Sequence, residues 1–173
     1  MSTQPALVLI GPMAAGKSRT GRRVAKRLGL DFRDTDSMIE SIHGPIREIF
    51  AERGEAAFRE LEREQVRRAL ESGGVIAFGG GAVLHPDTQA EIASSAVVYL
   101  QTTPEAVAPR LEGDSQRPLV ATDGLARWTE IYEARKPIYE RLGKLHIDTS
   151  HRPMDAVADE IAAWYRSRFG TGE

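Results

Sequence analysis

The stretch Ala6-Leu7-Val8-Leu9-Ile10-Gly11-Pro12-Met13-Ala14-Ala15-Gly16-Lys17-Ser18 is the most informative part of this 173-residue sequence. Its first five residues are apolar and predict a buried strand, and its second part has the pattern G-x-x-x-x-G-K-S. Residues 17–28 then keep helical spacing and stop before Gly29. A strand, a glycine-rich turn and a helix in this order are typical of a loop that binds the phosphates of a nucleotide.

The residue types in this loop suit phosphate chemistry. Gly11 and Gly16 let the backbone approach phosphate oxygens without a Cβ in the way, and a helix beginning near Lys17 points unpaired N–H groups at the same oxygens. Lys17 adds a cation for the β- and γ-phosphates, and the Ser18 hydroxyl is placed to ligate Mg²⁺. The alternative is a simple glycine turn with an exposed lysine. The full eight-residue pattern between a strand and a helix favours the phosphate-binding loop.

The composition excludes several classes of protein. Hydrophobic residues make up 41% and charged residues 28% of the chain, and the formal net charge of −2 gives no basic field for nucleic acid or a membrane surface. Cysteine is absent, which excludes disulfides, thiol catalysis and cysteine-bound zinc. Residues 1–5 lack a basic segment, the apolar run at 6–10 is too short for a signal peptide, and no run is long enough to span a membrane. We therefore expect a cytoplasmic enzyme.

Apolar runs alternate with helical patterns along the whole sequence. The expected strands are Ala6–Ile10, Leu30–Asp34, Val75–Phe78, Ala96–Leu100 and Leu145–Asp148. This alternation predicts an α/β fold with a mainly parallel sheet, in one domain that covers residues 1–173. The order of the strands in the sheet does not follow from the sequence.

Three boundaries between these elements are also predicted. Ser37 is expected to cap the helix that follows the second strand, and Gly54 is expected to separate a short helix from a longer amphipathic one over 55–71. The polar segment 112–124 is the longest interruption, and we interpret it as a mobile lid.

Two carboxylates follow the short second strand, at Asp34 and Asp36. If the segment is extended, their side chains point to the same side, so that one faces Mg²⁺ and the other meets the hydroxyl of an acceptor. The alternative is that Asp36 or Ser37 only caps the next helix.

Other signals are weak when each is taken alone. Arg59 and Glu62 have the i, i+3 spacing of a surface ion pair, which is the interpretation that the spacing favours. The glycines at 79–81 follow a strand and favour close approach of a ligand to the backbone. Arg117 in the polar segment suits a charge stabiliser near a nucleotide, or a surface residue, and Arg135 alone carries no prediction.

Together and in this order, these motifs resemble those of the shikimate kinase family. The matching segments are Gly11…Gly16-Lys17-Ser18, Asp34-Thr35-Asp36, Phe58-Arg59-Glu60-Leu61-Glu62, Gly79-Gly80-Gly81-Ala82-Val83, Arg117-Pro118-Leu119 and Arg135-Lys136-Pro137-Ile138-Tyr139. The resemblance implies a three-layer α/β/α fold of the P-loop NTPase type with a five-stranded parallel sheet. It implies an enzyme that uses ATP and Mg²⁺ to phosphorylate the 3-hydroxyl of shikimate, in the route to chorismate and the aromatic amino acids.

The resemblance also implies roles for single residues. Asp36 would bind the acceptor hydroxyls, Arg59 and Arg135 would hold its carboxylate, and Gly80 and Gly81 would let the backbone approach it. The residues implied in catalysis are Lys17, Asp36 and Arg117, and those implied at the metal are Ser18 and Asp34. The residues expected at the nucleotide are Gly11, Met13, Ala14, Ala15, Gly16, Lys17, Ser18, Arg19, Arg110 and Arg117.

The sequence departs from the family pattern at two places. Pro109 falls inside the helix expected over 104–111 and is predicted to kink or shorten it, so Arg110 matches the family's adenine-packing arginine only loosely. Arg19 follows the loop serine, Ser18, at a position where the family often has threonine.

Two other functions share part of this pattern. A related kinase of another sugar acid, such as gluconate, would use the same two arginines. A GTPase-like switch would need an Asn-Lys-x-Asp motif, and the chain contains no asparagine. The four histidines show no metal-ligand spacing, so we assign them no role. We expect a monomer that acts on a small molecule.

Overall fold

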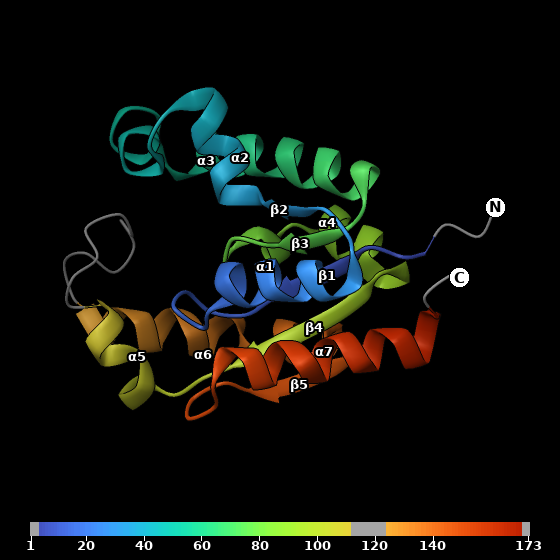
Figure 1. Ribbon diagram of the computed structural model, residues 1–173. Coiled ribbons are helices and arrows are strands. Elements are labelled where there is room, and N and C mark those ends of the chain that lie inside the picture. The colour runs from blue at the N-terminus through green and yellow to red at the C-terminus, as the bar shows by residue number, and fades with distance from the viewer. Residues whose placement is uncertain (1–3, 112–123, 171–173) are drawn as a thin grey trace.

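The computed structural model describes residues 4–111 and 124–170 and contains one five-stranded sheet (Figure 1). The strands are β1 (Leu7–Ile10), β2 (Phe32–Asp34), β3 (Val75–Ala77), β4 (Ala96–Gln101) and β5 (Leu145–Asp148). All neighbouring strands are parallel, and their order is β2-β3-β1-β4-β5. The predicted fold class is confirmed, and the phosphate-binding loop follows the central strand.

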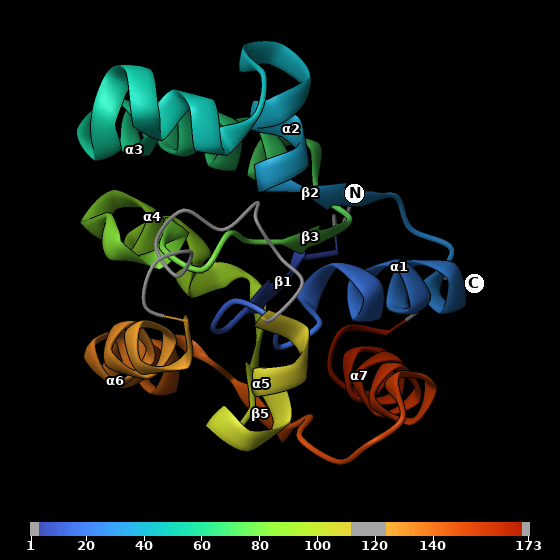
Figure 2. The ribbon, with the colours of Figure 1, turned by 90° about the vertical axis from the view of Figure 1, so that its left-hand side faces the viewer.

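Helices cover both faces of this sheet, as Figure 2 shows. Leu7 and Leu9 of β1 pack against α1 (Lys17–Leu28) and α7 (Met154–Phe169) on one face. Val8 and Ile10 point to the other face, where they join side chains of α3 (Ile46–Ser72) and α6 (Gly124–Leu142). All four β1 side chains are at most 1% exposed, which explains why this strand is a continuous apolar run and not an alternating one.

The helices after β2 begin differently from the prediction. The Asp34 side chain caps α2 (Thr35–His43) by accepting a hydrogen bond from the backbone N of Ser37 at 3.0 Å. The prediction that Ser37 caps this helix is therefore wrong, because the helix already begins at Thr35. The predicted break at Gly54 is confirmed, since this residue has φ 80° and ψ 172° inside α3.

The remaining elements are short or contain proline. They are the 3₁₀ turns η1 (Ala82–Leu84) and η2 (Ile92–Ser94), and the helices α4 (Pro86–Glu91) and α5 (Pro104–Leu111). Helix α5 continues through Pro109 to Leu111, so the proline does not shorten the helix over the described residues. Of the predicted lid, residues 112–123 lie outside the described part of the chain.

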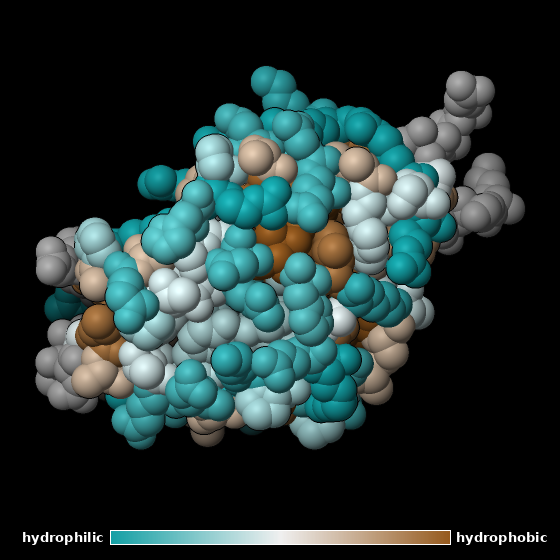
Figure 3. Space-filling view, turned by 90° about the horizontal axis from the view of Figure 1, so that it is seen from below, coloured by the Kyte–Doolittle hydropathy of each residue, from teal (hydrophilic) through white to brown (hydrophobic). Residues whose placement is uncertain are grey.

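The space-filling view shows the character of one face of the molecule. In Figure 3, most of the visible surface is hydrophilic, and hydrophobic side chains gather in small patches. Over residues 4–111 and 124–170, we find no helix with the length and apolar character that crossing a membrane requires.

Candidate active site

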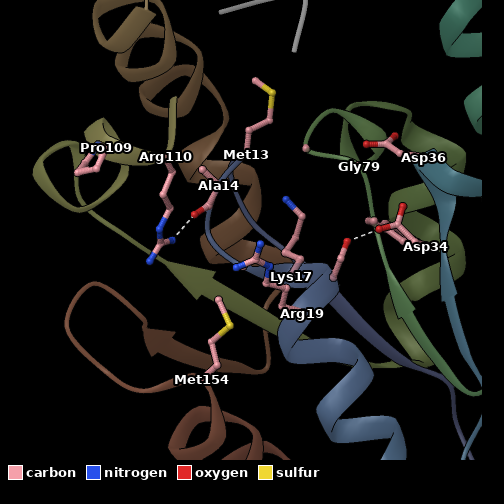
Figure 4. Close-up of a pocket in the computed structure, with 14 residues that line it drawn as sticks. Met13, Ala14, Lys17, Arg19, Asp34, Asp36, Gly79, Pro109, Arg110 and Met154 are labelled. Atoms are coloured by element: carbon pink, nitrogen blue, oxygen red, sulfur yellow. Dashed lines mark hydrogen bonds between the residues drawn. The ribbon is translucent and has the colours of Figure 1, made fainter. Parts of the chain in front are cut away.

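A cavity of about 570 Å³ opens at the edge of the sheet where β1, β2 and β3 end (Figure 4). It is lined by Met13, Ala14, Gly16, Lys17, Ser18, Arg19, Asp34, Asp36, Phe78, Gly79, Gly80, Pro109, Arg110 and Met154. Parallel strands bring the segments that follow their carboxyl ends to one edge, so motifs far apart in the sequence meet here. Most of the predicted site residues within the described chain line this cavity.

The backbone of the phosphate-binding loop has the shape of a cradle. Gly16 caps α1 in the left-handed conformation with φ 89°, and Ala14 is a non-glycine residue with φ 66°. Gly11 has φ 147°, and a Cβ there would overlap the carbonyl oxygen of Leu100. Positive φ values turn successive N–H groups toward one side, as a bound anion requires. This geometry fits the phosphates of a nucleotide.

Lys17 reaches back across its own loop. Its Nζ donates to the carbonyl oxygens of Gly11 at 2.6 Å and Pro12 at 2.9 Å. The ammonium group therefore stands at the mouth of the cradle, where phosphate oxygens would replace the two carbonyls as acceptors.

A hydroxyl and a carboxylate meet beside the loop. Ser18 Oγ donates to Asp34 Oδ2, while the other carboxylate oxygen caps α2. No group of three or more His, Cys, Asp or Glu residues that could hold a metal occurs within the described residues. The Ser18–Asp34 pair suits Mg²⁺, which commonly binds through one or two protein groups, water and substrate phosphates.

Asp36 lies two residues after Asp34, in the first turn of α2, and faces Gly79 (Figure 4). A Cβ at Gly79 would stand 2.5 Å from Asp36 Oδ1 and 3.1 Å from Glu62 Oε2. Burial raises the pKa of Asp36 to about 7, the Glu62 and Asp34 carboxylates add to the rise, and Lys17 opposes it. The prediction of an extended segment is wrong, because residues 35 and 36 are helical. The carboxylates of Asp34 and Asp36 still line the same cavity.

Arg59 is held in place by a buried partner. Its Nη1 lies 2.8 Å from Oε1 of Glu62, whose side chain is 4% exposed. The guanidinium packs so closely on Gly81 that a Cβ there would overlap it. The interpretation as a surface ion pair is therefore wrong: the same i, i+3 spacing also occurs where one partner faces the interior.

Arg135 approaches the glycine segment from the other side. It stands on α6 and is 8% exposed, and a Cβ at Gly80 would lie 3.4 Å from its Nη1. Two guanidinium groups thus flank Gly80 and Gly81, from α3 and from α6. A planar carboxylate is the group that such a pair binds well.

The comparisons with known proteins agree with this geometry. A family model for shikimate kinase matches residues 13–166. The chain belongs to the shikimate kinase family. The shikimate kinase of Streptomyces coelicolor is 45% identical over 155 residues, which are 88% of this chain and 91% of that protein. The shikimate kinase of Thermobifida fusca is 44% identical over 164 residues, which are 94% of this chain and 95% of that protein.

Solved structures show the same relationship. A shikimate kinase from Acinetobacter baumannii in complex with shikimate has a TM-score of 0.91 and 31% identity, and the match covers 95% of this chain and 94% of that one. A gluconokinase from Sinorhizobium meliloti has a TM-score of 0.65 at 17% identity, which shows a shared fold alone. As a shikimate kinase, the enzyme transfers the γ-phosphate of ATP to the 3-hydroxyl of shikimate and releases shikimate 3-phosphate and ADP.

Some residues of this cavity were predicted only loosely from the sequence or were not predicted. Arg110 Nη1 donates to the carbonyl oxygen of Ala14, so this arginine lies at the rim of the loop. Arg19 and Pro109 also line this cavity, as does Met154, which carried no signal in the sequence. Arg117 lies outside the described residues.

Thr35 was also missed, since nothing in the sequence marks it as different from its neighbours. Thr35 is fully buried, and its Oγ1 accepts a hydrogen bond from the backbone N of Gly79 at 3.0 Å. This bond ties the carboxylate segment to the glycine segment.

Proposed function

We propose that this enzyme holds the shikimate carboxylate between Arg59 and Arg135, with the ring lying against Gly80 and Gly81. The support is the convergence of two guanidinium groups on a stretch of backbone without side chains. Paired charged hydrogen bonds to a carboxylate fix its orientation as well as its position. The ring hydroxyls then point toward α2 and the phosphate-binding loop.

Asp36 orients the attacking 3-hydroxyl and accepts its proton. A pKa of about 7 leaves the carboxylate able to take up a proton near neutral pH and to release it after the reaction. The loose transition state of phosphoryl transfer needs little proton removal early, so positioning is the larger part of this role.

The loop residues Gly11–Ser18 hold the ATP phosphates, and Lys17 stabilises the negative charge on the γ-phosphoryl group during its transfer. Two of its acceptors are backbone carbonyls of the loop, which phosphate oxygens can replace. Arg110 and Met154 frame the end of the cavity where the adenosine would lie. Arg117 closes over the phosphates as a further cation.

Ser18 and Asp34 would hold Mg²⁺, which would neutralise charge on the β- and γ-phosphates when bound there with ATP. The support is the contact of this hydroxyl and this carboxylate at the edge of the cradle. We further infer that the enzyme works as a cytoplasmic monomer, with no nucleic acid as partner, in keeping with its net charge of −2.

The observation that carries this assignment is the position of Asp36, whose carboxylate faces Gly79 in the cavity that Lys17 also lines, next to the glycines against which Arg59 and Arg135 pack. The test is a coupled assay of ADP release with shikimate or gluconate as acceptor. Asp36→Asn should lower kcat with shikimate by on the order of 10²–10⁴. The control is Asp31→Asn, because the Asp31 side chain is 85% exposed. A preference for gluconate, or a loss below tenfold in Asp36→Asn, would contradict the assignment.

A further inference from the structure

Two aromatic residues of α6 donate hydrogen bonds to backbone carbonyls of two different segments that line the active site. Trp128 Nε1 donates to the carbonyl oxygen of Met13 at 2.8 Å, and Tyr139 Oη donates to that of Gly80 at 2.5 Å. The two side chains are each 1% exposed. They are eleven residues apart, which is about three helical turns, so they leave the same face of the helix.

The two carbonyls belong to segments with different tasks. Met13 stands in the phosphate-binding loop, one residue before the left-handed Ala14. Gly80 lies between the two arginines that flank the acceptor site. The segments touch each other, because a Cβ at Gly80 would stand 3.7 Å from the backbone N of Met13 and 3.6 Å from its Cγ.

The helix face that carries both donors is fixed to the sheet. Tyr132, between the two donors, shares a hydrogen bond of 2.5 Å with the hydroxyl of Tyr99 on β4. Trp128 packs edge-on against Tyr132 with ring centroids 5.2 Å apart, and Tyr139 stacks on Tyr99 at 5.4 Å. A donor anchored in this way can hold a loop carbonyl in one place, whereas a surface side chain could not.

We propose that Trp128 and Tyr139 are positioning residues, which together set the distance between the nucleotide loop and the acceptor segment. Phosphoryl transfer depends on this distance, since a misplacement of about 1 Å can slow an enzyme about 10²-fold. Tyr139 also stands beside Arg135 on the same helix, and its burial raises the pKa of its hydroxyl to about 12, so it stays a donor at neutral pH. The proposal rests on the site roles given above for the loop and the glycine segment.

The test compares Trp128→Phe and Tyr139→Phe with Tyr165→Phe. Each of the first two removes one donor to a loop, while the control removes a hydroxyl on α7 that is also 1% exposed and donates to the carbonyl oxygen of Pro5 at 2.7 Å, outside both loops. Trp128→Phe should raise KM for ATP about fivefold and leave KM for shikimate within about twofold, and Tyr139→Phe should do the reverse. Both should lower kcat, and the double variant more than either. The control should keep both KM values and kcat, whatever its melting temperature.

The expected split between the two KM values separates positioning from a structural role, which would change stability without selecting a substrate. The proposal is overturned if all three variants behave alike, or if only one of the two donors matters. Should Trp128→Phe fail to fold, Tyr139→Phe decides alone, because it removes only an oxygen: an unchanged KM for shikimate overturns the proposal. Asp36 is intact in every variant, so these outcomes are independent of whether its assigned role holds.

Discussion

Arg59 and Glu62 stand on the same helix, and their side chains meet at 2.8 Å with the Glu62 carboxylate facing the protein interior. Burial raises the pKa of Glu62, and the Arg59 and Arg135 guanidinium groups oppose that rise. An arginine that binds a buried carboxylate in this way is oriented before substrate arrives. Little side-chain freedom is then left to lose on binding, and this preorganisation favours affinity.

Glu62→Gln should therefore weaken shikimate binding while ATP binding stays close to wild type. The amide keeps the shape of the side chain and loses its charge, so the Arg59 guanidinium is held less firmly. We expect KM for shikimate to rise about tenfold, as for loss of one charged hydrogen bond. Steady-state kinetics measures this, with Glu64→Gln as the control because Glu64 pairs with Arg67 and Arg68 on the exposed side of α3. Equal effects in the two variants would contradict the role of Glu62.

The pH dependence of the reaction should report the raised pKa of Asp36. The ionised form accepts the acceptor's proton, so kcat/KM for shikimate should rise with pH and level off above a midpoint near 7. Because the Glu62 carboxylate contributes to that pKa, Glu62→Gln should move the midpoint to lower pH. A profile that is flat from pH 5 to 8, or a midpoint that Glu62→Gln leaves in place, would argue against Asp36 as the group that titrates.

A side chain at Gly81 should disturb the site, although the backbone conformation there suits any residue. Its φ is −96°, which any residue adopts, so only the close approach of Arg59 demands glycine. Gly81→Ala should push the guanidinium away from the acceptor site and raise KM for shikimate about tenfold or more. Thermal unfolding is the companion measurement. A melting temperature near that of the wild type together with the raised KM is the expected result, and an unchanged KM would show that Arg59 has other positions from which to bind.

Arg117→Ala should lower kcat by on the order of 10³ if this residue acts as other transition-state arginines do. KM for ATP should change much less, because the arginine is expected to interact with the phosphoryl group in the transition state and not with the nucleotide in the ground state. Arg127→Ala is a suitable control, since Arg127 pairs with Glu130 on the exposed side of α6. A loss of less than tenfold would remove Arg117 from this role.

The sequence predicted what depends on local pattern. The buried central strand, the glycine-rich loop and the break at Gly54 each follow from residue types close together in the chain. The cap of α2 was missed because Asp34 and Ser37 are both good capping residues, and only the helix start distinguishes them. The tie between Thr35 and Gly79 could not be predicted, since it joins segments 44 residues apart through a side chain with no motif of its own.

The burial of Glu62 is a related case. An i, i+3 pair has the same spacing on an exposed helix face and on one that faces the protein interior, so only the packing of α3 on the glycine segment tells the two apart. The resemblance to a family pointed to Arg59, and the fold shows where this arginine lies, paired with Glu62 and packed against Gly81.

Ionisation of Asp36 should lower the free energy of unfolding as the pH rises. Its pKa rises from 3.8 in the unfolded chain to about 7 in the folded one, so between these values the folded state binds more protons and stability falls as pH rises. Asp36→Asn removes this loss. Relative to the wild type, the variant should gain little at pH 4 and progressively more toward pH 8, by at most about 4 kcal/mol. Urea unfolding of both proteins across this range measures the difference. A pH-independent difference would show that Asp36 ionises as it does in the unfolded chain, and the same result would weaken its assignment as the proton acceptor.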